Sequence, residues 1–231
     1  MRAPISIVMP VLNAQEGLRH SIPALSEGLE VGLIAELIMS DGGSSDYTEA
    51  VADAAGAVWV TGAPGRGGQI ARGVAKARAP WILILHADTA LQPGWAEAVG
   101  AALLDRKTAH FGHLQFDTPG PAAGFVAGWA NWRARWLGLP YGDQGLLIHQ
   151  SLLEEVGGIP DLPLMEDVAL ARALRGRLRP LGAVARTSAA RYEREGWLRR
   201  GARNLSLLLR YLGGADPARL AAAYRAPQGQ D

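Results

Sequence analysis

Apolar positions in the first part of the chain follow two alternating patterns, short continuous runs and longer stretches with helical spacing. Each short run ends at proline, glycine or a polar cluster, which is typical of buried strands. These runs occupy residues 5–9, 36–40, 57–61 and 81–85. Helical spacing fills the intervals, over residues 18–29, 46–55 and 69–78. Strands that alternate with helices predict right-handed crossovers and a doubly wound parallel sheet with helices on both faces.

The helix predicted over 46–55 opens with Asp46 and has Glu49 three residues later, which indicates a capping box. Further along, the chain becomes less regular, but the same patterns predict a helix from Pro93 to Asp105 and strands at 110–117, 146–149 and 183–191. Helices are predicted over 121–137, 151–156 and 195–212, and one from Asp167. Because no repeat, linker or low-complexity tract separates these parts, we expect one domain over residues 1–231.

Composition removes several classes of protein from consideration. The chain has no cysteine, so disulfides, thiolate zinc sites and a cysteine nucleophile are excluded. With 23 Lys and Arg against 22 Asp and Glu, a nucleic-acid binder that relies on overall basicity is not expected. The longest uncharged region, around residues 119–132, is broken by glycine and proline and is shorter than the ~20 residues of a membrane span. Pro4 and Pro10 interrupt the apolar N-terminus, so we expect no signal peptide and a cytoplasmic protein.

Polar and glycine-rich segments follow each predicted strand of the first half. They are Pro10–Asn13, Asp41–Asp46, Gly65–Gln69 and His86–Thr89. In an open parallel sheet, ligands bind beyond the carboxyl ends of the strands, where these segments meet. The loop over 65–68 leads into a helix, so its free N–H groups and the helix dipole favour an anion. A phosphate-bearing ligand is therefore the expected class.

Two carboxylates of the first half have a functional and a structural interpretation. Asp41 is placed to accept a hydrogen bond from a nucleobase N–H, or it only shapes its loop through an Asx-turn. Asp88 follows the most apolar strand and suits a hard cation with oxygen ligands, with water and a diphosphate completing the shell. The alternative is an ordinary turn residue. His86, two positions earlier, is a weak ligand, a partner of the ligand, or a packing side chain.

Later segments are open to the same two kinds of interpretation. Glu166 and Asp167 stand in the first turn of a helix, where carboxylates favour the dipole even without a catalytic role. Residues 191–203 carry five arginines, and leucines follow them at helical spacing, which suits a helix that covers an active site, lies on an anionic membrane, or packs on its own domain. The tryptophans at 129, 132 and 136 form either core or a hydrophobic acceptor site.

Taken in order, the motifs resemble a known enzyme family. Five motifs resemble those of family 2 glycosyltransferases, which are inverting enzymes of the GT-A fold. The motifs are residues 5–13 (ISIVMPVLN), 41–46 (DGGSSD), 65–69 (GRGGQ), 85–89 (LHADT) and 165–167 (MED). The resemblance runs from residue 5 to about 176. Residues 141–145 (YGDQG) and 163–168 (PLMEDV) resemble a small bacterial group of radical-SAM and selenodomain-associated transferases. The resemblance to family 2 glycosyltransferases implies a GT-A-like (Rossmann-like) α/β fold with a mostly parallel sheet flanked by helices.

The resemblance also implies roles for particular residues. A nucleotide-sugar donor would be bound by Pro10, Asn13, Asp41, Gly42, Arg66, Gln69 and Asp88. Among them, Asp41 would recognise the base. Asp88 and His86 would hold Mg²⁺ or Mn²⁺, although His86 stands where the family usually has the first aspartate of its Asp-x-Asp motif. Asp167 would be the catalytic base, with Glu166 beside it.

The implied donor is a UDP- or GDP-sugar. The sequence does not identify the acceptor; a lipid-linked compound at the inner face of the membrane is one class that the resemblance allows. Residues 1–117 would bind the donor, and residues 118–231 the acceptor. Two alternatives stay open: a sugar-phosphate nucleotidyltransferase, and a catalytically silent module that only binds a nucleotide sugar. The former carries a glycine-rich basic signature after its first strand, where this chain has Pro10–Asn13.

Overall fold

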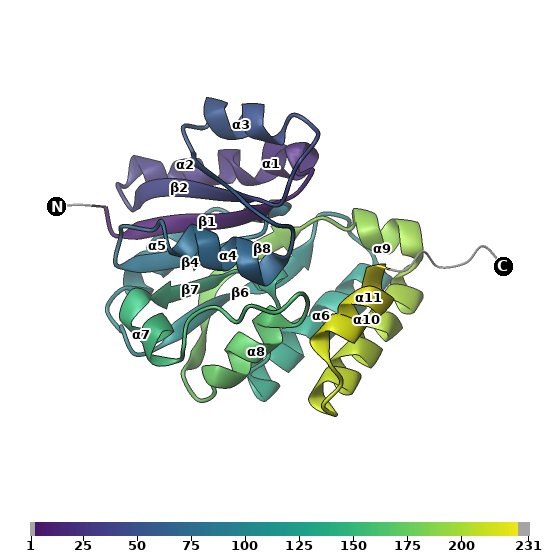
Figure 1. Ribbon diagram of the computed structural model, residues 1–231. Helices are drawn as coiled ribbons and strands as arrows, with labels where there is room; N and C mark the ends of the chain where they lie inside the picture. The colour runs from purple at the N-terminus through teal and green to yellow at the C-terminus, as the bar shows by residue number, and fades with distance from the viewer. Residues whose placement is uncertain (1–2, 226–231) are drawn as a thin grey trace.

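The computed structural model describes residues 3–225, which form an eight-stranded mixed sheet with helices on both faces (Figure 1). The strand order is β3-β2-β1-β4-β7-β6-β8-β5. The strands are β1 (Ile5–Val11), β2 (Ile34–Asp41), β3 (Val58–Thr61), β4 (Trp81–Ile84), β5 (Thr89–Leu91), β6 (Ala109–Phe116), β7 (Leu146–His149) and β8 (Leu178–Thr187).

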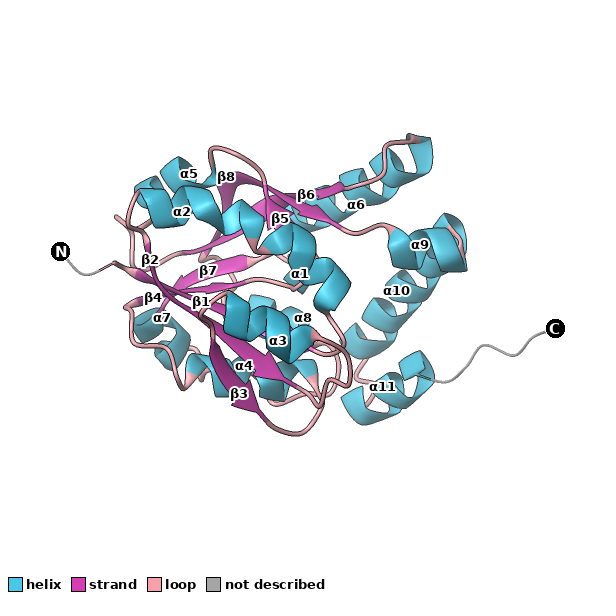
Figure 2. Ribbon diagram, turned by 90° about the horizontal axis from the view of Figure 1, so that it is seen from above, coloured by secondary structure: helices cyan, strands magenta, loops and turns pink. Residues whose placement is uncertain are grey.

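Helices connect these strands and cover the sheet. They are α1 (Gln15–Ser21), η1 (Pro23–Leu25), α2 (Ser26–Glu30), α3 (Thr48–Ala54), α4 (Arg66–Val74), α5 (Trp95–Ala102), α6 (Pro121–Leu137), η2 (Gly142–Gln144), α7 (Gln150–Glu155), α8 (Glu166–Ala173), α9 (Ala190–Glu195), α10 (Trp197–Leu212) and α11 (Pro217–Arg225). Figure 2 shows α9, α10 and α11 gathered at one end of the molecule, beside α6. Among residues 3–225, no helix combines the length and the apolar content that a bilayer span requires.

Strands β1 to β4 form the parallel part of the sheet, as the sequence predicts. β1 pairs with β2 on one side and with β4 on the other, both in parallel. Val11 lies opposite Asp41, and Asp41 lies opposite Thr61, so the carboxyl ends of β1, β2 and β3 align. The segments that follow these strands are therefore brought to one edge of the sheet.

The rest of the sheet is mixed. β7 runs antiparallel to β4, and β6 antiparallel to β7, whereas β8 runs parallel to β6. β5 closes the edge antiparallel to β8. Four of the seven pairings are parallel, so the expected mostly parallel α/β sheet with flanking helices is confirmed.

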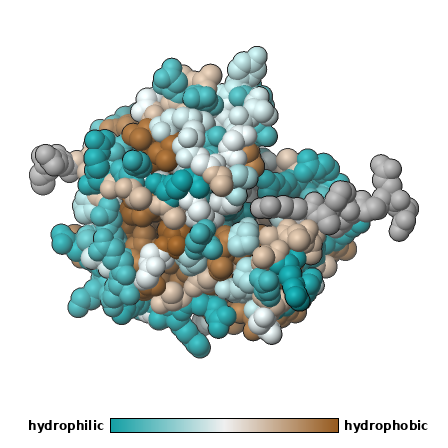
Figure 3. Space-filling view, viewed as in Figure 1, coloured by the Kyte–Doolittle hydropathy of each residue, from teal (hydrophilic) through white to brown (hydrophobic). Residues whose placement is uncertain are grey.

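Apolar side chains from both faces of β1 are buried, which gives the protein a core on each side of the sheet. Ile7 and Met9 pack with Leu18 and Trp95 on one face. Val8 belongs to the core on the other face, which includes residues of helices α4, α7 and α8. On the outside of that second face, Figure 3 shows hydrophobic groups gathered among mainly hydrophilic ones.

Several local predictions need correction. The helix expected over 18–29 is broken into α1, η1 and α2, because Pro23 cannot donate a backbone hydrogen bond. The capping box at Asp46 and Glu49 is absent, since Asp46 instead accepts from the backbone of Thr48 and Gln15. The strand expected over 183–191 is the longer β8, which ends before α9. β5 and α11 were not predicted.

Candidate functional site

Two joined cavities lie at the edge where β1, β2 and β4 end. An outer cleft of about 1280 Å³ is lined from the first half by Pro10, Asn13, Gln69 and neighbouring residues. A cavity of about 140 Å³, which we call the inner cavity, is lined by residues of both halves of the chain. Both are lined by Arg66, His86, Asp88, Leu164, Thr187, Ser188, Arg191 and Tyr224.

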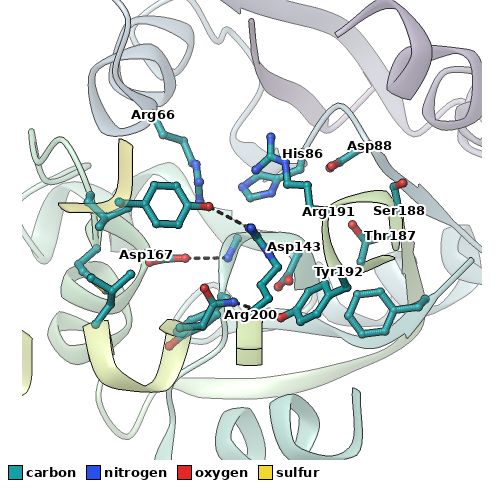
Figure 4. A pocket seen from close by; sticks show the side chains of 18 residues that line it. Arg66, His86, Asp88, Asp143, Asp167, Thr187, Ser188, Arg191, Tyr192 and Arg200 are labelled. Carbon is teal, nitrogen blue, oxygen red and sulfur yellow. Dashed lines mark hydrogen bonds between the residues drawn. The ribbon is translucent and has the colours of Figure 1, made fainter. Parts of the chain in front are cut away.

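The inner cavity brings together charged side chains from distant parts of the sequence. In Figure 4, Arg66, His86 and Asp88 lie along one side, and Asp167, Asp143 and Arg200 lie across from them. Asp88 and Asp167 are 79 positions apart in the sequence, yet both line this cavity. A ligand in it would meet carboxylates on two sides and arginines between them.

The loop after β1 is tied to the loop after β2. Asn13 adopts a left-handed conformation with φ of 49°. Its backbone N–H donates to Ser44 Oγ at 2.8 Å, and its Oδ1 accepts from the backbone N–H of Ser45 at 2.8 Å. These bonds fix the rim of the outer cleft, and they show that Asn13 shapes the pocket as well as lining it.

Asp41 has the Asx-turn geometry of the structural interpretation. Its carboxylate accepts from the backbone N–H of Gly43 at 2.7 Å, and from the N–H and hydroxyl of Ser44. The side chain is buried and lines neither of the two cavities. Asp41 therefore organises the loop beside the cleft.

Gln69 joins three segments at the cleft. Its Nε2 donates to the carbonyl oxygens of Val11 and Ser40, and its Oε1 accepts from the backbone N–H of Gly65. Gly42 makes room for this amide, because a Cβ at that position would lie 3.1 Å from Gln69 Cδ. One buried side chain thus connects the ends of β1 and β2 to the glycine loop.

The glycine loop packs on the segment that precedes α8. A Cβ at Gly67 would lie 2.6 Å from the carbonyl oxygen of Pro160 and 2.8 Å from that of Leu162. Because the Cβ would meet backbone, which yields less easily than the end of a side chain, only glycine fits there. The first turn of α4 therefore rests directly on the chain that leads to Glu166 and Asp167.

Arg66 reaches across this contact to Glu166. Its Nε lies 3.4 Å from Glu166 Oε1, and the Glu166 side chain is only 2% exposed. Burial and the neighbouring Asp167 raise the pKa of Glu166 to about 7, an effect that Arg66 only partly offsets. Burial alone would lower the pKa of Arg66, but Glu166 and Asp167 raise it above its usual value.

Asp167 is presented to the cavity by the start of α8. Met165 precedes the helix in a left-handed conformation, with φ of 67°. The Oδ2 atom of Asp167 accepts from the backbone N–H of Gly142 at 3.0 Å, and Oδ1 accepts from Val168 N–H. The carboxylate is partly exposed and is positioned by these two backbone donors.

His86 is packed against Gly142. Its Nε2 is buried without a hydrogen-bond partner, and a Cβ on Gly142 would overlap the ring. Burial, with the positive charges of Arg66 and Arg191, lowers the pKa of His86 well below its usual range. The imidazole is therefore neutral, but its Nε2 faces the backbone of η2.

Asp88 is the side chain best placed for a divalent cation. Its carboxylate is partly exposed and lines both cavities. Within residues 3–225, however, no three His, Asp or Glu side chains group closely enough to hold a metal ion by themselves. The donor set fits a hard cation that takes its other ligands from water and a diphosphate.

Asp143 is a functional candidate that sequence reasoning missed. It belongs to η2, lines the inner cavity, and its Oδ1 is buried without a partner. Burial raises its pKa to about 6; Arg133 opposes the shift, while Asp167 and Asp88 add to it. The signal available was an aspartate among glycines immediately before a buried strand.

Of the residues expected to form the site, most share the two cavities. Arg66, His86 and Asp88 line both, Asp167 lines the inner one, and Pro10, Asn13 and Gln69 line the outer one. Asp41, Gly42 and Glu166 line neither. Glu166 instead lines a small, mainly apolar cavity, which His86 and Asp167 also line.

Comparison with known proteins gives a family match over the first half of the chain and a shared fold. Residues 6–118 match the model of the family described as "Glycosyl transferase family 2". A crystal structure described as a mycobacterial protein is similar with a TM-score of 0.55 and 25% identity, over 80% of this chain and 65% of that one. No curated protein matches the chain significantly in sequence.

Two named structures share the fold at lower identity. Glucosyl-3-phosphoglycerate synthase from Mycobacterium tuberculosis, in complex with Mn²⁺, UDP and glucosyl-3-phosphoglycerate, has a TM-score of 0.58 and 21% identity, over 80% of this chain and 70% of that one. S. aureus TarS has a TM-score of 0.60 and 14% identity, over 94% of this chain and 41% of that one. The chain thus spans less than half of TarS.

Proposed function

We propose that the chain is an inverting, metal-dependent glycosyltransferase, because residues 6–118 match the model of glycosyl transferase family 2 and glucosyl-3-phosphoglycerate synthase shares its fold. It would move a sugar from a nucleoside-diphosphate donor to an acceptor hydroxyl. The observation that carries the proposal is the shared cavity of Asp88 and Asp167, with Arg66 and Arg191 lining it as well. A donor diphosphate would be bound by the arginines and by a cation at Asp88, and an acceptor hydroxyl would give its proton to the carboxylate of Asp167.

The outer cleft is the proposed donor site. The loop that Asp41 organises would receive the base, and a carboxylate has about four lone-pair sites. The Asp41 carboxylate already accepts from three donors, the N–H groups of Gly43 and Ser44 and the Ser44 hydroxyl, so a base N–H would be a fourth. Pro10 and Asn13 would line the nucleoside, and Arg66 would meet the diphosphate. A UDP- or GDP-sugar is the proposed donor class.

Asp167 is the proposed catalytic base. An acceptor hydroxyl is a weak acid, so a positioned carboxylate must take its proton while the new bond to the anomeric carbon forms. Such general-base catalysis contributes roughly 10²- to 10⁴-fold. The nucleoside diphosphate leaves from the opposite face of the sugar, so a single displacement inverts the anomeric configuration. The bonds from Gly142 and Val168 to Asp167 would keep the carboxylate aimed during this step.

Arg66 and Arg191 would stabilise the negative charge that grows on the departing diphosphate, because both line the cavities that Asp88 also lines. Asp88 would hold the Mg²⁺ or Mn²⁺. That ion, when bound, would neutralise diphosphate charge as a Lewis acid. Glu166 would act indirectly, by holding Arg66 in place through their ion pair.

The second half of the chain, from residue 118, is the proposed acceptor side, because it supplies Asp143, Asp167, Arg191 and Arg200 to the inner cavity. We propose a lipid-linked acceptor, reached from the cytoplasmic face of a membrane. The helices α6 and α10 support this class, since both expose large apolar side chains and α10 also lines the inner cavity.

A donor screen tests the proposed function. UDP-, GDP- and dTDP-sugars are added with Mn²⁺ or Mg²⁺, and thermal unfolding is followed, because a ligand that binds only the folded state raises the melting temperature. We expect one nucleotide series to stabilise the protein and to yield free nucleoside diphosphate once a pool of acceptors is supplied. Release of pyrophosphate from a nucleoside triphosphate and a sugar phosphate would instead indicate a nucleotidyltransferase. Donor binding without turnover in any pool would indicate a silent binding module.

A further inference from the structure

Helix α6 carries a stripe of exposed aromatic side chains, which we call the aromatic stripe. It consists of Phe125, Trp129, Trp132 and Trp136, which are 42–73% exposed. Their spacing of four, three and four residues places them on one face of the helix. Ala123, Ala130 and Ala134 of the same helix are buried. The large aromatic residues thus face outward and the small residues inward, the reverse of the usual arrangement in a water-soluble helix.

Helix α10, which contacts α6, carries a second exposed stripe. We call it the leucine stripe, and it consists of Leu198, Leu205, Leu209 and Leu212. At 3.6 residues per turn, this stripe lies roughly opposite Arg200, Asn204 and Leu207, which line the inner cavity. One helix therefore has the cavity on one side and an exposed apolar surface on the other.

The charge on these two helices has one sign. Neither α6 nor α10 contains an aspartate or glutamate. Arg135 on α6, and Arg199 and Arg210 on α10, are exposed. Tryptophan favours the boundary between water and hydrocarbon, and basic residues beside such a surface favour anionic headgroups.

A second copy of this chain is a poorer occupant for the same surface. A symmetric dimer would place the same patch on both partners. Arginines would then approach arginines, with no acidic residue on either helix to compensate them. An anionic bilayer offers the opposite charge and accommodates tryptophan rings at its boundary.

We infer that the aromatic stripe of α6, flanked by the leucine stripe of α10, is a docking surface for an anionic lipid membrane. Docking through these helices places α10 between the bilayer and the inner cavity, so the cavity would lie one helix diameter, ~10 Å, from the headgroup layer in which a lipid-linked acceptor presents its hydroxyl. The link to the acceptor rests on the proposed function. Membrane binding itself does not, since it depends on side chains that line neither cavity.

Vesicle binding tests the inference. The full chain is mixed with vesicles of phosphatidylcholine alone or with vesicles that also contain phosphatidylglycerol, and is then floated on a density gradient. About 30 mole per cent phosphatidylglycerol gives the second kind of vesicle a strong negative surface potential. We expect binding to the anionic vesicles that weakens with salt. We also expect quenching of tryptophan fluorescence by lipids brominated on their acyl chains, because Trp129, Trp132 and Trp136 would reach the acyl boundary.

A matched pair of variants locates the surface. W129Q/W132Q/W136Q should lower the partition coefficient on anionic vesicles by about tenfold or more and remove most of the quenching. The control, L29Q/L104Q, changes exposed leucines of α2 and the turn after α5, at the other end of the molecule (Figure 1), and should bind as the wild type does. Because none of these side chains belongs to the buried core, both variants should fold, with a small loss of stability in the triple variant from the Trp129–Trp132 stack, and thermal unfolding checks this.

Three outcomes would overturn the inference. They are absence of binding to either kind of vesicle, equal binding by W129Q/W132Q/W136Q and the wild type, and a wild-type dimer that the triple variant converts to a monomer in sedimentation analysis. Donor-induced thermal stabilisation is measured on the same preparations without lipid. Failure of the membrane inference and failure of the proposed function are therefore separate results.

Discussion

Arg66 and Glu166 join the two halves of the protein beneath the cleft, with Arg66 Nε 3.4 Å from Glu166 Oε1. Arg66 begins the helix that follows the glycine loop, and Glu166 begins the helix that carries Asp167. Neither Glu166 carboxylate oxygen has a hydrogen-bond partner among the described residues. The arginine is therefore held by charge alone, beside the place where we propose that the diphosphate binds.

Ionisation of Glu166 is expected to reduce stability as the pH rises. Its folded pKa of about 7 exceeds its ordinary value of 4.5, so the folded state binds more protons than the unfolded state between these values. The contribution of protonated Glu166 to the free energy of unfolding is complete below pH 4.5 and is lost as the pH rises through 7. The glutamine in Glu166→Gln cannot ionise. Between pH 5 and 8 the free energy of unfolding should therefore fall less in the variant than in the wild type, the difference being on the order of 2 kcal/mol.

Urea unfolding at several pH values measures this difference. Glu193→Gln, an exposed substitution on α9, is the matched control and should keep the wild-type slope. Parallel stability curves for wild type and Glu166→Gln would contradict the expected protonation.

Removing the proposed base should separate chemistry from donor binding. Asp167→Asn keeps the shape of the side chain but cannot take a proton, so we expect transfer to fall by about 10²- to 10⁴-fold. Donor affinity, measured by titration calorimetry, should stay close to that of the wild type. Asp53→Asn makes the same chemical change on the exposed face of α3 and should leave the rate unchanged. A large loss of donor affinity in Asp167→Asn would argue against the role of base.

Asp88→Ala should remove the effect of metal on donor binding. The wild type is expected to bind its donor more tightly with Mn²⁺ or Mg²⁺ than with EDTA, because Asp88 would link the ion to the diphosphate. In the variant, the two affinities should become equal. Wild-type donor affinity that does not change with EDTA would count against a metal at Asp88.

A methyl group at Gly142 should disturb the inner cavity. Its Cβ would overlap the His86 ring, which is itself confined by buried neighbours. We expect Gly142→Ala to lower the free energy of unfolding by about 1–3 kcal/mol, as overpacking does. Gly100→Ala, in the middle of α5 with open space around it, should instead stabilise the protein by about 0.5–1 kcal/mol. Thermal and urea unfolding of both variants measure the effect, and equal stability of the two would contradict the packing argument.

Much of the fold is predictable because its first half has strong local signals. The run at 81–85 is continuous and apolar, and the run at 5–9 is interrupted only by Ser6, since both faces of β1 and β4 are buried. β5 has only three residues, and its pairing with β8 depends on chain segments nearly a hundred residues apart. No local pattern could identify it. The sheet order beyond β4 is likewise decided by tertiary packing.

The site shows the same division. That Asp88 and Arg66 share a cleft follows from the alignment of parallel strand ends, which the sequence pattern predicts. The bracing role of Gln69 does not follow, because its amide contacts two backbone carbonyls that only the folded chain brings close. Asp143 was missed for a related reason. Its burial and its acidic neighbours come from segments far from it in sequence.

Glycine at position 67 has a consequence for engineering this enzyme. The backbone at Gly67, next to the glycine loop, rests on the backbone of residues 160–162, with no side chain between them to absorb a mismatch. A chimera that exchanges the first half for that of a relative will therefore be active only if the incoming loop also has glycine here and the same path. Specificity for donors is thus better altered by point substitutions around the rim than by swapping whole halves.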